Sequence, residues 1–396
     1  METARDGESR RAFWDLTMDR ERLHRLLRLG FEKGASDIHF QVGYLPLYRF
    51  NGELVELKYK VLTMADTEAI ARLLLEFDPS KSLDGVSEVD MAYEIAGEGR
   101  FRVNISRERK AYNIVLRVIP LSIKNFEELN LPSVLRTIAS VQRGLVLVTG
   151  ATGMGKSTTL ATMLQEINRA LKCKIVTIED PVEFIFTHER SIITQREIGT
   201  DTPSFPAALR AALRQDPDVI MVGEIRDAET VDTALKAAET GHAVFSSIHT
   251  NDVVTTLRRV VSFFPVEEHQ QVRERLAENL QSIVSLRLLP NKKGTSRVPA
   301  VEVLRTTRSI RECIRDPNRA VEIRDHIEKG HSDMEMQTFD QHLLELYQAN
   351  KIKLETARDA ASNPRDFATK LALEGDSSYT QESVTSLPGC NDESRF

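Results

Sequence analysis

Apolar and polar positions alternate over much of the first 120 residues, with a period of two that is typical of strands with one face buried. The Asn51-Gly52 dipeptide lies between two such stretches and predicts a hairpin turn. Helical spacing of Leu23, Leu26, Leu27 and Phe31 predicts a first helix, and a second helix is expected around 65–77. The predicted strands are 37–40, 47–50, 53–55, 91–95, 100–104 and 112–119. The first 120 residues therefore indicate a small α+β domain with a mostly antiparallel sheet.

The rhythm changes after about residue 132 to short, unbroken apolar runs separated by helical segments. The predicted strands there are Leu145–Thr149, Lys174–Ile178, Val219–Val222 and Ala243–Ile248. Strand and helix in alternation predict an α/β fold with a parallel sheet and helices on both faces. The segment 265–373 is expected to be helical throughout. Its apolar stripe of Val272, Leu276, Leu280 and Ile283 is interpreted as core rather than as a binding face.

These patterns divide the chain of 396 residues into two domains and flexible ends. We expect a flexible N-terminus at 1–20, the small domain at 21–119, a linker at 120–132, the larger domain at 133–373 and a disordered tail at 374–396. The tail is rich in Ser, Glu and Thr, as disordered segments are.

Bulk charge and cysteine content narrow the choice of function and compartment. The net charge of -6 argues against a general nucleic-acid binder. Cys173, Cys313 and Cys390 lie far apart and form neither a zinc pattern nor a disulfide framework, so a reducing compartment is expected. No apolar run has membrane length and the N-terminus carries no signal-peptide core. A cytoplasmic protein that reaches a membrane only through a partner is the resulting interpretation.

A glycine-rich loop supplies the strongest chemical signal. It follows the run Leu145–Thr149, precedes an expected helix, and reads Gly150-Ala151-Thr152-Gly153-Met154-Gly155-Lys156-Ser157-Thr158. This is G-x-x-x-x-G-K-[ST] in the strand-to-helix context of a phosphate-binding loop. Backbone N–H groups and the start of a helix would hold phosphate oxygens. Lys156 would reach the β- and γ-phosphates of ATP and Ser157 would bind Mg²⁺.

Acidic and imidazole side chains follow the other predicted strands of the parallel sheet, at the edge where ligands bind. Glu224 comes just after Val219–Val222, whereas Asp218 begins that strand, roughly 20 Å from its far end at the usual strand rise. Glu224 is therefore the candidate Mg²⁺-organising acid, together with Ser157. His249 follows Ala243–Ile248 and is interpreted as a γ-phosphate sensor, as a contact to a neighbouring subunit, or as a structural histidine.

Hydrolysis of ATP also needs a group that orients water and cations that stabilise charge on the transferring phosphate. Glu179, Asp180 and Glu183 are the candidate bases, and Glu183 is favoured. Arg100 and Arg102 share one face of a predicted strand, and Arg117 lies on the next strand. The three arginines are expected to act within the chain, to act on the ATP of the next subunit in a ring, or to be solvated strand residues.

The motifs resemble the secretion ATPase superfamily and, within it, the type IV pilus retraction ATPases, the PilT and PilU family. The matching residues, besides the loop, are 177–184, 213–220, 222–227 and 238–242 in the larger domain, and 34–39, 100–104 and 336–341 elsewhere. The resemblance covers about residues 20–372. It implies a hexameric ATPase with a PAS-like N-terminal domain and a RecA-like ATPase domain that uses ATP and Mg²⁺.

By motif, the resemblance also assigns Glu183 as the catalytic acid of the Asp box, Glu224 as the Walker B acid and His249 as the His-box residue. It implies a motor on the cytoplasmic side of the inner membrane that docks on a pilus platform protein and removes pilin subunits, giving twitching motility. The chain lacks the extra N-terminal domain and the four-cysteine insert usual in relatives that extend pili, which favours retraction.

Two other functions remain open from the sequence. An accessory PilU-type ATPase would assist a second retraction motor. The chain departs from the pattern of the family that it resembles at Met154, where a small polar residue is usual, and near Arg258, where an acid is usual, and these departures leave the accessory role open. A RecA-like motor on nucleic acid is disfavoured by the acidic charge balance and the lack of a basic-aromatic stripe.

Overall fold

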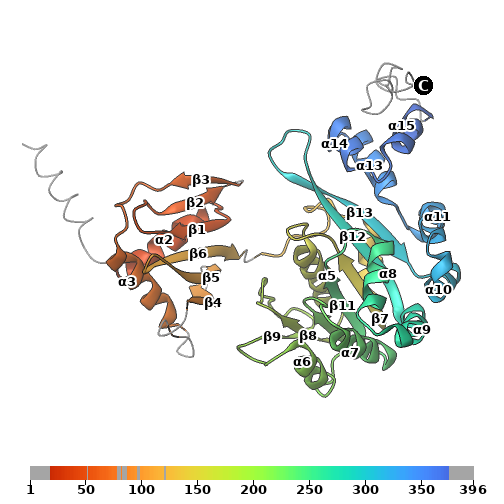
Figure 1. Ribbon diagram of the computed structural model, residues 1–396, viewed down its shortest axis with the longest axis horizontal. Coiled ribbons are helices and arrows are strands. Elements are labelled where there is room, and N and C mark those ends of the chain that lie inside the picture. The colour runs from red at the N-terminus through yellow and green to blue at the C-terminus, as the bar shows by residue number, and fades with distance from the viewer. Residues whose placement is uncertain are drawn as a thin grey trace, which may run out of the picture. The chain divides into compact units, whose positions relative to one another are not determined.

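A computed structural model describes residues 18–50, 52–77, 82, 87–95, 99–119 and 122–373 (Figure 1). Several expectations lie outside these residues: the flexible N-terminus up to 17, Asn51 of the hairpin turn, the start of the linker at 120–121, and the tail from 374 with Cys390. The chain divides into two compact units. One contains residues up to 122 together with 183–185, and the other contains 123–182 and 186 onward.

In its described residues, the first unit is an antiparallel sheet with two helices, as the sequence predicts. Its strands are β1 (Asp37–Phe40), β2 (Leu47–Phe50), β3 (Glu53–Glu56), β4 (Glu88–Ile95), β5 (Gly99–Glu108) and β6 (Ala111–Ile119), in the spatial order β3-β2-β1-β6-β5-β4. All neighbouring strands in this sheet are antiparallel. The helices are α2 (Arg20–Glu32) and α3 (Met64–Leu75).

Local chemistry explains where both helices of this unit begin. The Asp19 carboxylate accepts a hydrogen bond from the Arg22 backbone N–H, which caps α2. Thr63 and Asp66 form a capping box at the start of α3. On β5, Phe101 and Val103 are buried in the core with the helices, so the residues between them occupy the opposite face of the sheet.

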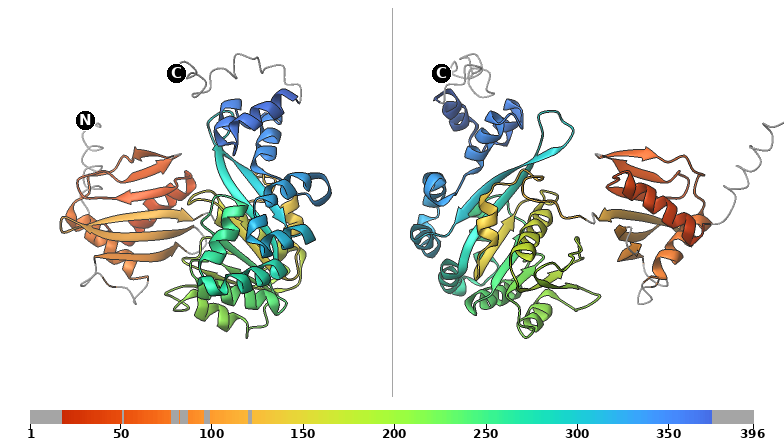
Figure 2. Two further views of the ribbon diagram at one scale, coloured as in Figure 1. Left: turned by 45° about the vertical axis from the view of Figure 1, so that its right-hand side comes forward. Right: turned by 180° about the vertical axis from the view of Figure 1, so that it is seen from behind.

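The second unit is built on a seven-stranded sheet, with the strand order β13-β12-β7-β11-β10-β8-β9. The strands are β7 (Gly144–Thr149), β8 (Lys174–Glu179), β9 (Ile192–Glu197), β10 (Val219–Val222), β11 (Ala243–Ile248), β12 (Leu280–Pro290) and β13 (Arg297–Arg305). All pairs are parallel except β12 with β13. Every residue of β7 and of β11 is buried, so both faces of the sheet centre are covered (Figure 2).

Helices cover this sheet, and further helices follow its last strand, β13, toward the C-terminus of the chain. They are α4 (Val134–Ala139), α5 (Lys156–Ala170), α6 (Phe205–Ala212), α7 (Ala228–Glu239), α8 (Val253–Ser262), α9 (His269–Asn279), α10 (Arg308–Arg315), α11 (Glu322–Lys329), α12 (His331–Met334), α13 (Phe339–Gln348), α14 (Leu354–Ala360) and α15 (Pro364–Leu373). The cluster of α13 to α15 packs on the far part of β13 through Phe339, Leu343 and Phe367.

The expectation of an all-helical segment over 265–373 is wrong between 280 and 305. Leu280 and Ile283 are buried core residues, as expected, but they lie on β12 and not on a helix. Figure 1 shows the two long strands, with β12 beside β7 and β13 on the outer side of β12. β12 is buried on both faces over most of its length, and such a strand has apolar residues at helical as well as alternating positions. Its pairing partner β7 lies far away in sequence, so no local pattern shows the ladder. The sheet-edge strand β9 was not predicted either.

Candidate functional site

The candidate site lies at the carboxyl edge of the four central parallel strands. In the register of the sheet, Thr149 at the end of β7 lies beside Ile248 at the end of β11. Val222 at the end of β10 lies beside Ile178 of β8. The loops that follow these strands therefore leave from one edge, which is where ligands bind in open parallel sheets.

The glycine-rich loop has a backbone that other residues do not easily adopt. Gly150 has φ 152°, and an added Cβ would lie 2.8 Å from the carbonyl oxygen of Leu286. Gly153 has φ 78° and open space around it. The loop ends at Gly155, the N-cap of α5, which gives no side-chain hydrogen bond to the first amide groups of that helix. These amides are thus left to an anion at the positive end of the helix.

Strands β12 and β13, which the sequence did not predict, brace this loop. The Met154 sulfur accepts a hydrogen bond from the Leu288 backbone N–H at 3.2 Å. Arg297 Nη1 donates to the Gly153 carbonyl at 3.5 Å. Met154 therefore ties the loop to β12.

Lys156 connects the loop with the end of β11. The side chain is buried, and its Nζ donates to the carbonyls of Gly150 at 2.8 Å and Ala151 at 3.1 Å. The same Nζ lies 3.3 Å from Nδ1 of His249. The ammonium group is thereby held over the loop, while Ser157 is exposed and Thr158 is half-buried.

His249 joins Lys156 to Glu224. Its Nε2 lies 2.9 Å from Oε2 of Glu224, and Arg226 forms an ion pair with the same carboxylate. Burial and the charges of Lys156 and Arg226 lower the pKa of His249, so the imidazole is neutral near pH 7. In that state Nε2–H donates to Glu224 and Nδ1 accepts from the ammonium group of Lys156. The two contacts fix one tautomer and link three side chains in a row.

The structure separates the two acids of β10 as the sequence argument requires. Asp218 precedes β10 and accepts a hydrogen bond from the Lys174 backbone N–H at the start of β8, at 2.8 Å. It therefore lies at the opposite end of the strands from Glu224. Glu224 and Ser157 remain the oxygen donors proposed for Mg²⁺.

The three candidate bases after β8 have different surroundings. Glu179 is buried and accepts hydrogen bonds from Thr177 Oγ1 at 2.6 Å and Gln195 Nε2 at 3.2 Å. These bonds hold it within the sheet. Asp180 is exposed and Glu183 is half-buried, on the segment that follows the cis Asp180–Pro181 peptide.

The three candidate arginines lie together on the first unit. Arg102 on β5 is directly opposite Arg117 on β6, and Arg100 is on the same face of β5. Arg117 Nε donates to Asp37 Oδ1 on β1 at 3.0 Å. Asp37 is a partner that sequence reasoning missed, because the pairing of β1 with β6 crosses most of the unit.

A groove of about 830 Å³ opens beside the loop within the second unit. Ala151 and Met154 line it on the loop side, and Asn251 lines it after β11. Its other walls are residues 286–290 of β12 and residues 356 and 359–362 in and after α14. The size suits the base and ribose of a nucleotide whose phosphates lie on the loop. None of the helices in the described part of the chain is both long enough and apolar enough to span a membrane.

A phosphate-binding loop between β7 and α5, with polar groups from neighbouring parallel strands, defines the chain as a P-loop nucleotide-binding protein. The model of the Type II/IV secretion system protein family matches residues 21–384, so the chain belongs to that family. The resemblance inferred from the motifs is thereby confirmed.

Several of the similar proteins carry names from type IV pili. The chain is 41% identical to the Pseudomonas aeruginosa type IV pilus retraction ATPase PilT, over 86% of this chain and 98% of that protein. It is 38% identical to the type IV pilus ATPase PilU of the same organism, over 89% of this chain and 92% of that protein. A crystal structure of the pilus retraction motor PilT with bound ADP superposes with a TM-score of 0.78, at 42% identity, and covers 89% of this chain and 99% of that one.

Proposed function

We propose that this chain is the ATP-hydrolysing motor of type IV pilus retraction, acting as a ring of six copies. The row of Lys156, His249 and Glu224 beside the glycine-rich loop is the observation that carries the proposal, because it sets a cation, a neutral imidazole and an acid around the phosphate position. Similarity to PilT over nearly the full length of both chains supports the assignment to retraction. The inner-membrane platform protein of the pilus is the proposed partner, with the motor on its cytoplasmic side.

In the proposed reaction, the backbone amides of the loop and Lys156 hold the β- and γ-phosphates of ATP. Ser157 and Glu224 hold Mg²⁺ when it is bound, and the ion neutralises charge on the phosphate oxygens. Glu183 accepts a proton from the attacking water as the oxygen bonds to the γ-phosphorus. The bond from that phosphorus to the bridging oxygen breaks, and ADP and phosphate leave.

His249 is proposed to report the γ-phosphate to the rest of the site. A γ-phosphate draws Lys156 toward itself, which removes the cation from Nδ1 of His249. The imidazole then turns to the phosphate or to a neighbouring subunit, and its contact with Glu224 changes. Arg100, Arg102 and Arg117 are proposed to stabilise the developing charge from the next subunit of the ring.

The assignment of Glu183 is tested with two variants of one segment. Glu183→Gln is expected to bind ATP with unchanged affinity and to lower steady-state ATP hydrolysis at least about 100-fold, because the amide cannot accept the proton of the water. Asp180→Asn, at the exposed acid of the same segment, is the matched control and is expected to keep most of the activity. An active Glu183→Gln protein beside an inactive Asp180→Asn protein moves the base to Asp180.

Cells that lack the protein distinguish retraction from the alternatives. Excess pili that do not retract are the expected phenotype, whereas bald cells would indicate extension. An accessory PilU-type role predicts a defect only when a second retraction motor is also weakened, together with copurification of that motor. Strong stimulation of ATP hydrolysis by single-stranded DNA would instead favour a nucleic-acid motor, against the net charge of -6.

A further inference from the structure

Three side chains with metal-binding atoms meet on α10 and α11, away from the glycine-rich loop. Cys313 is buried on α10, and Glu322 and His326 lie one turn apart on α11. One ligand atom from each of the three residues lies within 4.8 Å of the other two. Among the described residues this is the group of His, Cys, Asp and Glu side chains that meets the spacing of a metal site.

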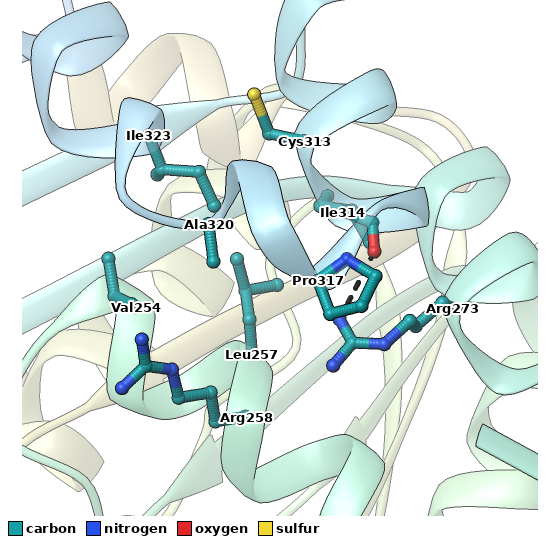
Figure 3. Close-up of a pocket in the computed structure, with 9 residues that line it drawn as sticks. All are labelled: Val254, Leu257, Arg258, Arg273, Cys313, Ile314, Pro317, Ala320 and Ile323. Atoms are coloured by element: carbon teal, nitrogen blue, oxygen red, sulfur yellow. Dashed lines mark hydrogen bonds between the residues drawn. The ribbon is translucent and has the colours of Figure 1, made fainter. Parts of the chain in front are cut away.

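Figure 3 shows the surroundings of the cysteine. Cys313 and Ile323, the neighbour of Glu322, come from different helices around a cavity of about 250 Å³. The walls are otherwise mainly apolar, with Val254, Leu257 and Ala320 among them. α10 and α11 are thus joined here by apolar packing, to which Cys313 itself contributes.

His326 has an unsatisfied atom in this cluster. Its Nε2 is buried and has no hydrogen-bond partner, although 32% of the side chain is exposed. The nearest oxygen of Glu322 is 3.9 Å away, too far for a hydrogen bond. A buried nitrogen without a partner costs free energy unless something occupies the space beside it.

We propose that Cys313, Glu322 and His326 bind a Zn²⁺ ion that clips α10 to α11. With ordinary zinc–ligand distances and tetrahedral angles, the nitrogen and oxygen ligands lie about 3.4 Å apart and the sulfur and nitrogen about 3.6 Å apart. Side-chain adjustments of about 1 Å bring the observed separations, 3.9 Å between His326 and Glu322 and at most 4.8 Å within the group, to these values. A water molecule completes the four ligands, as in zinc sites with three protein donors.

The choice of metal follows from the donors. A thiolate and an imidazole are ligands of Zn²⁺ and related transition metals, whereas Mg²⁺ and Ca²⁺ take oxygen ligands. Binding needs no electron transfer: the Cys313 thiol releases its proton to solvent as the sulfur–zinc bond forms. The site is thereby chemically distinct from the Mg²⁺ position proposed at Ser157 and Glu224.

Arg319 prepares the carboxylate of this site. Its Nη2 donates to Glu322 Oε2 at 2.8 Å and its Nε to Oε1 at 3.0 Å, while Nη1 donates to Glu312 at 3.3 Å. The Nε–H is shared with Oε2, at 3.2 Å. The two N–H groups therefore use only part of the four lone-pair sites of the carboxylate, and they orient Glu322 while leaving it able to bind an ion. A hydrogen-bonded ligand of this kind is usual around protein-bound metals.

The test uses the full chain without an affinity tag and without nucleotide, titrated with Co²⁺ as a spectroscopic substitute for Zn²⁺. We expect about one equivalent of Co²⁺ to bind and to give the near-ultraviolet absorption of a thiolate–cobalt bond, which Zn²⁺ then removes. Cys313→Ser is expected to abolish this absorption. Cys173→Ser is the matched control and should leave it unchanged, because Cys173 contacts Ser191 and not this cluster.

A second variant guards against misfolding of the buried cysteine position. His326→Gln, at a partly exposed position, is expected to keep the circular dichroism of the wild type and to weaken Zn²⁺ binding at least about tenfold. Zn²⁺ should also raise the unfolding temperature of the wild type by about 5 °C and have little effect on this variant. A missing thiolate band in the wild type, a band that persists in Cys313→Ser, or unweakened binding by His326→Gln would each overturn the proposal.

Discussion

At the scale of single residues, the spacing of motifs was enough to pick out the side chains that meet. Lys156 begins α5 after the loop that follows β7, whereas Glu224 and His249 follow β10 and β11, and the three form one row of contacts. What the sequence did not show is the neutral state of His249, which depends on burial and on two nearby cations. The ion pair of Arg226 with Glu224 was also not predicted, since nothing in the motif specifies a partner for the acid.

Two of the three glycines of the loop, Gly150 and Gly153, give a prediction at this scale. Gly150→Ala places a Cβ against the backbone oxygen of Leu286 and should distort the loop, lowering ADP affinity more than about tenfold and lowering the unfolding temperature. Gly153→Ala has the same chemistry in open space and costs only the strain of its positive φ, about 1–2 kcal/mol.

Isothermal titration with ADP and thermal unfolding of both variants check this difference. The prediction is wrong if Gly153→Ala proves the more damaging change, because open space at Gly153 would then be of no consequence.

At the scale of elements, one buried acid links α8 to β13. Glu302 on β13 accepts a hydrogen bond from the Val253 backbone N–H, the first residue of α8, at 2.9 Å. Burial raises the pKa of Glu302 to about 7. The folded protein therefore holds a proton that the unfolded chain, with an ordinary carboxyl pKa, releases at lower pH.

This shift gives a pH dependence with a definite sign. Since the folded-state pKa is raised, the contribution of Glu302 to the free energy of unfolding is complete below about pH 4.5 and is lost as the pH rises through about 7. The loss is at most about 1.4 kcal/mol per pH unit. Glu302→Gln keeps the hydrogen bond to Val253 and cannot titrate. Relative to the wild type, the variant should gain as much as about 3 kcal/mol of unfolding free energy between pH 5 and 8.

Urea unfolding of both proteins at pH 5, 6, 7 and 8 measures this gain. Parallel stability curves for wild type and Glu302→Gln over that range would show that Glu302 does not hold its proton. Burial lowers the pKa of His342 to about 4. Its contribution to the free energy of unfolding therefore rises with pH, opposite in sign to that of Glu302.

At the scale of the whole molecule, a proposed ring gives the three arginines a place in catalysis that one chain does not. Arg102 is exposed on the face of β5 that points away from the core of its unit, opposite Arg117. An exposed cation of this kind is available to a neighbouring copy. The expectation that it acts in trans is a prediction about assembly.

Mixing two inactive variants tests that prediction. Arg102→Ala and Glu183→Gln are each expected to lose ATP hydrolysis. If base and arginine come from adjacent copies, a 1:1 mixed ring regains about a quarter of the sites, since each complete site needs one intact residue from each of two neighbours. If both act within one copy, no site is complete in the mixture.

Steady-state hydrolysis after co-refolding or subunit exchange gives the readout, with each variant alone as the control. An inactive mixture, under conditions where subunit exchange of labelled copies is seen, would assign the arginines to their own chain.

The sequence by itself determined the strand-to-helix context of the glycine-rich loop, the carboxyl-edge placement of Glu224 and His249, and the two kinds of sheet. These features follow from local periodicity, and parallel strands place their ends at one edge whatever their order. Tertiary structure alone decided that 280–305 forms strands, that Met154 anchors the loop to β12, and that Cys313 meets His326. Those outcomes depend on hydrogen bonds and packing between residues far apart in the chain, which no local pattern records.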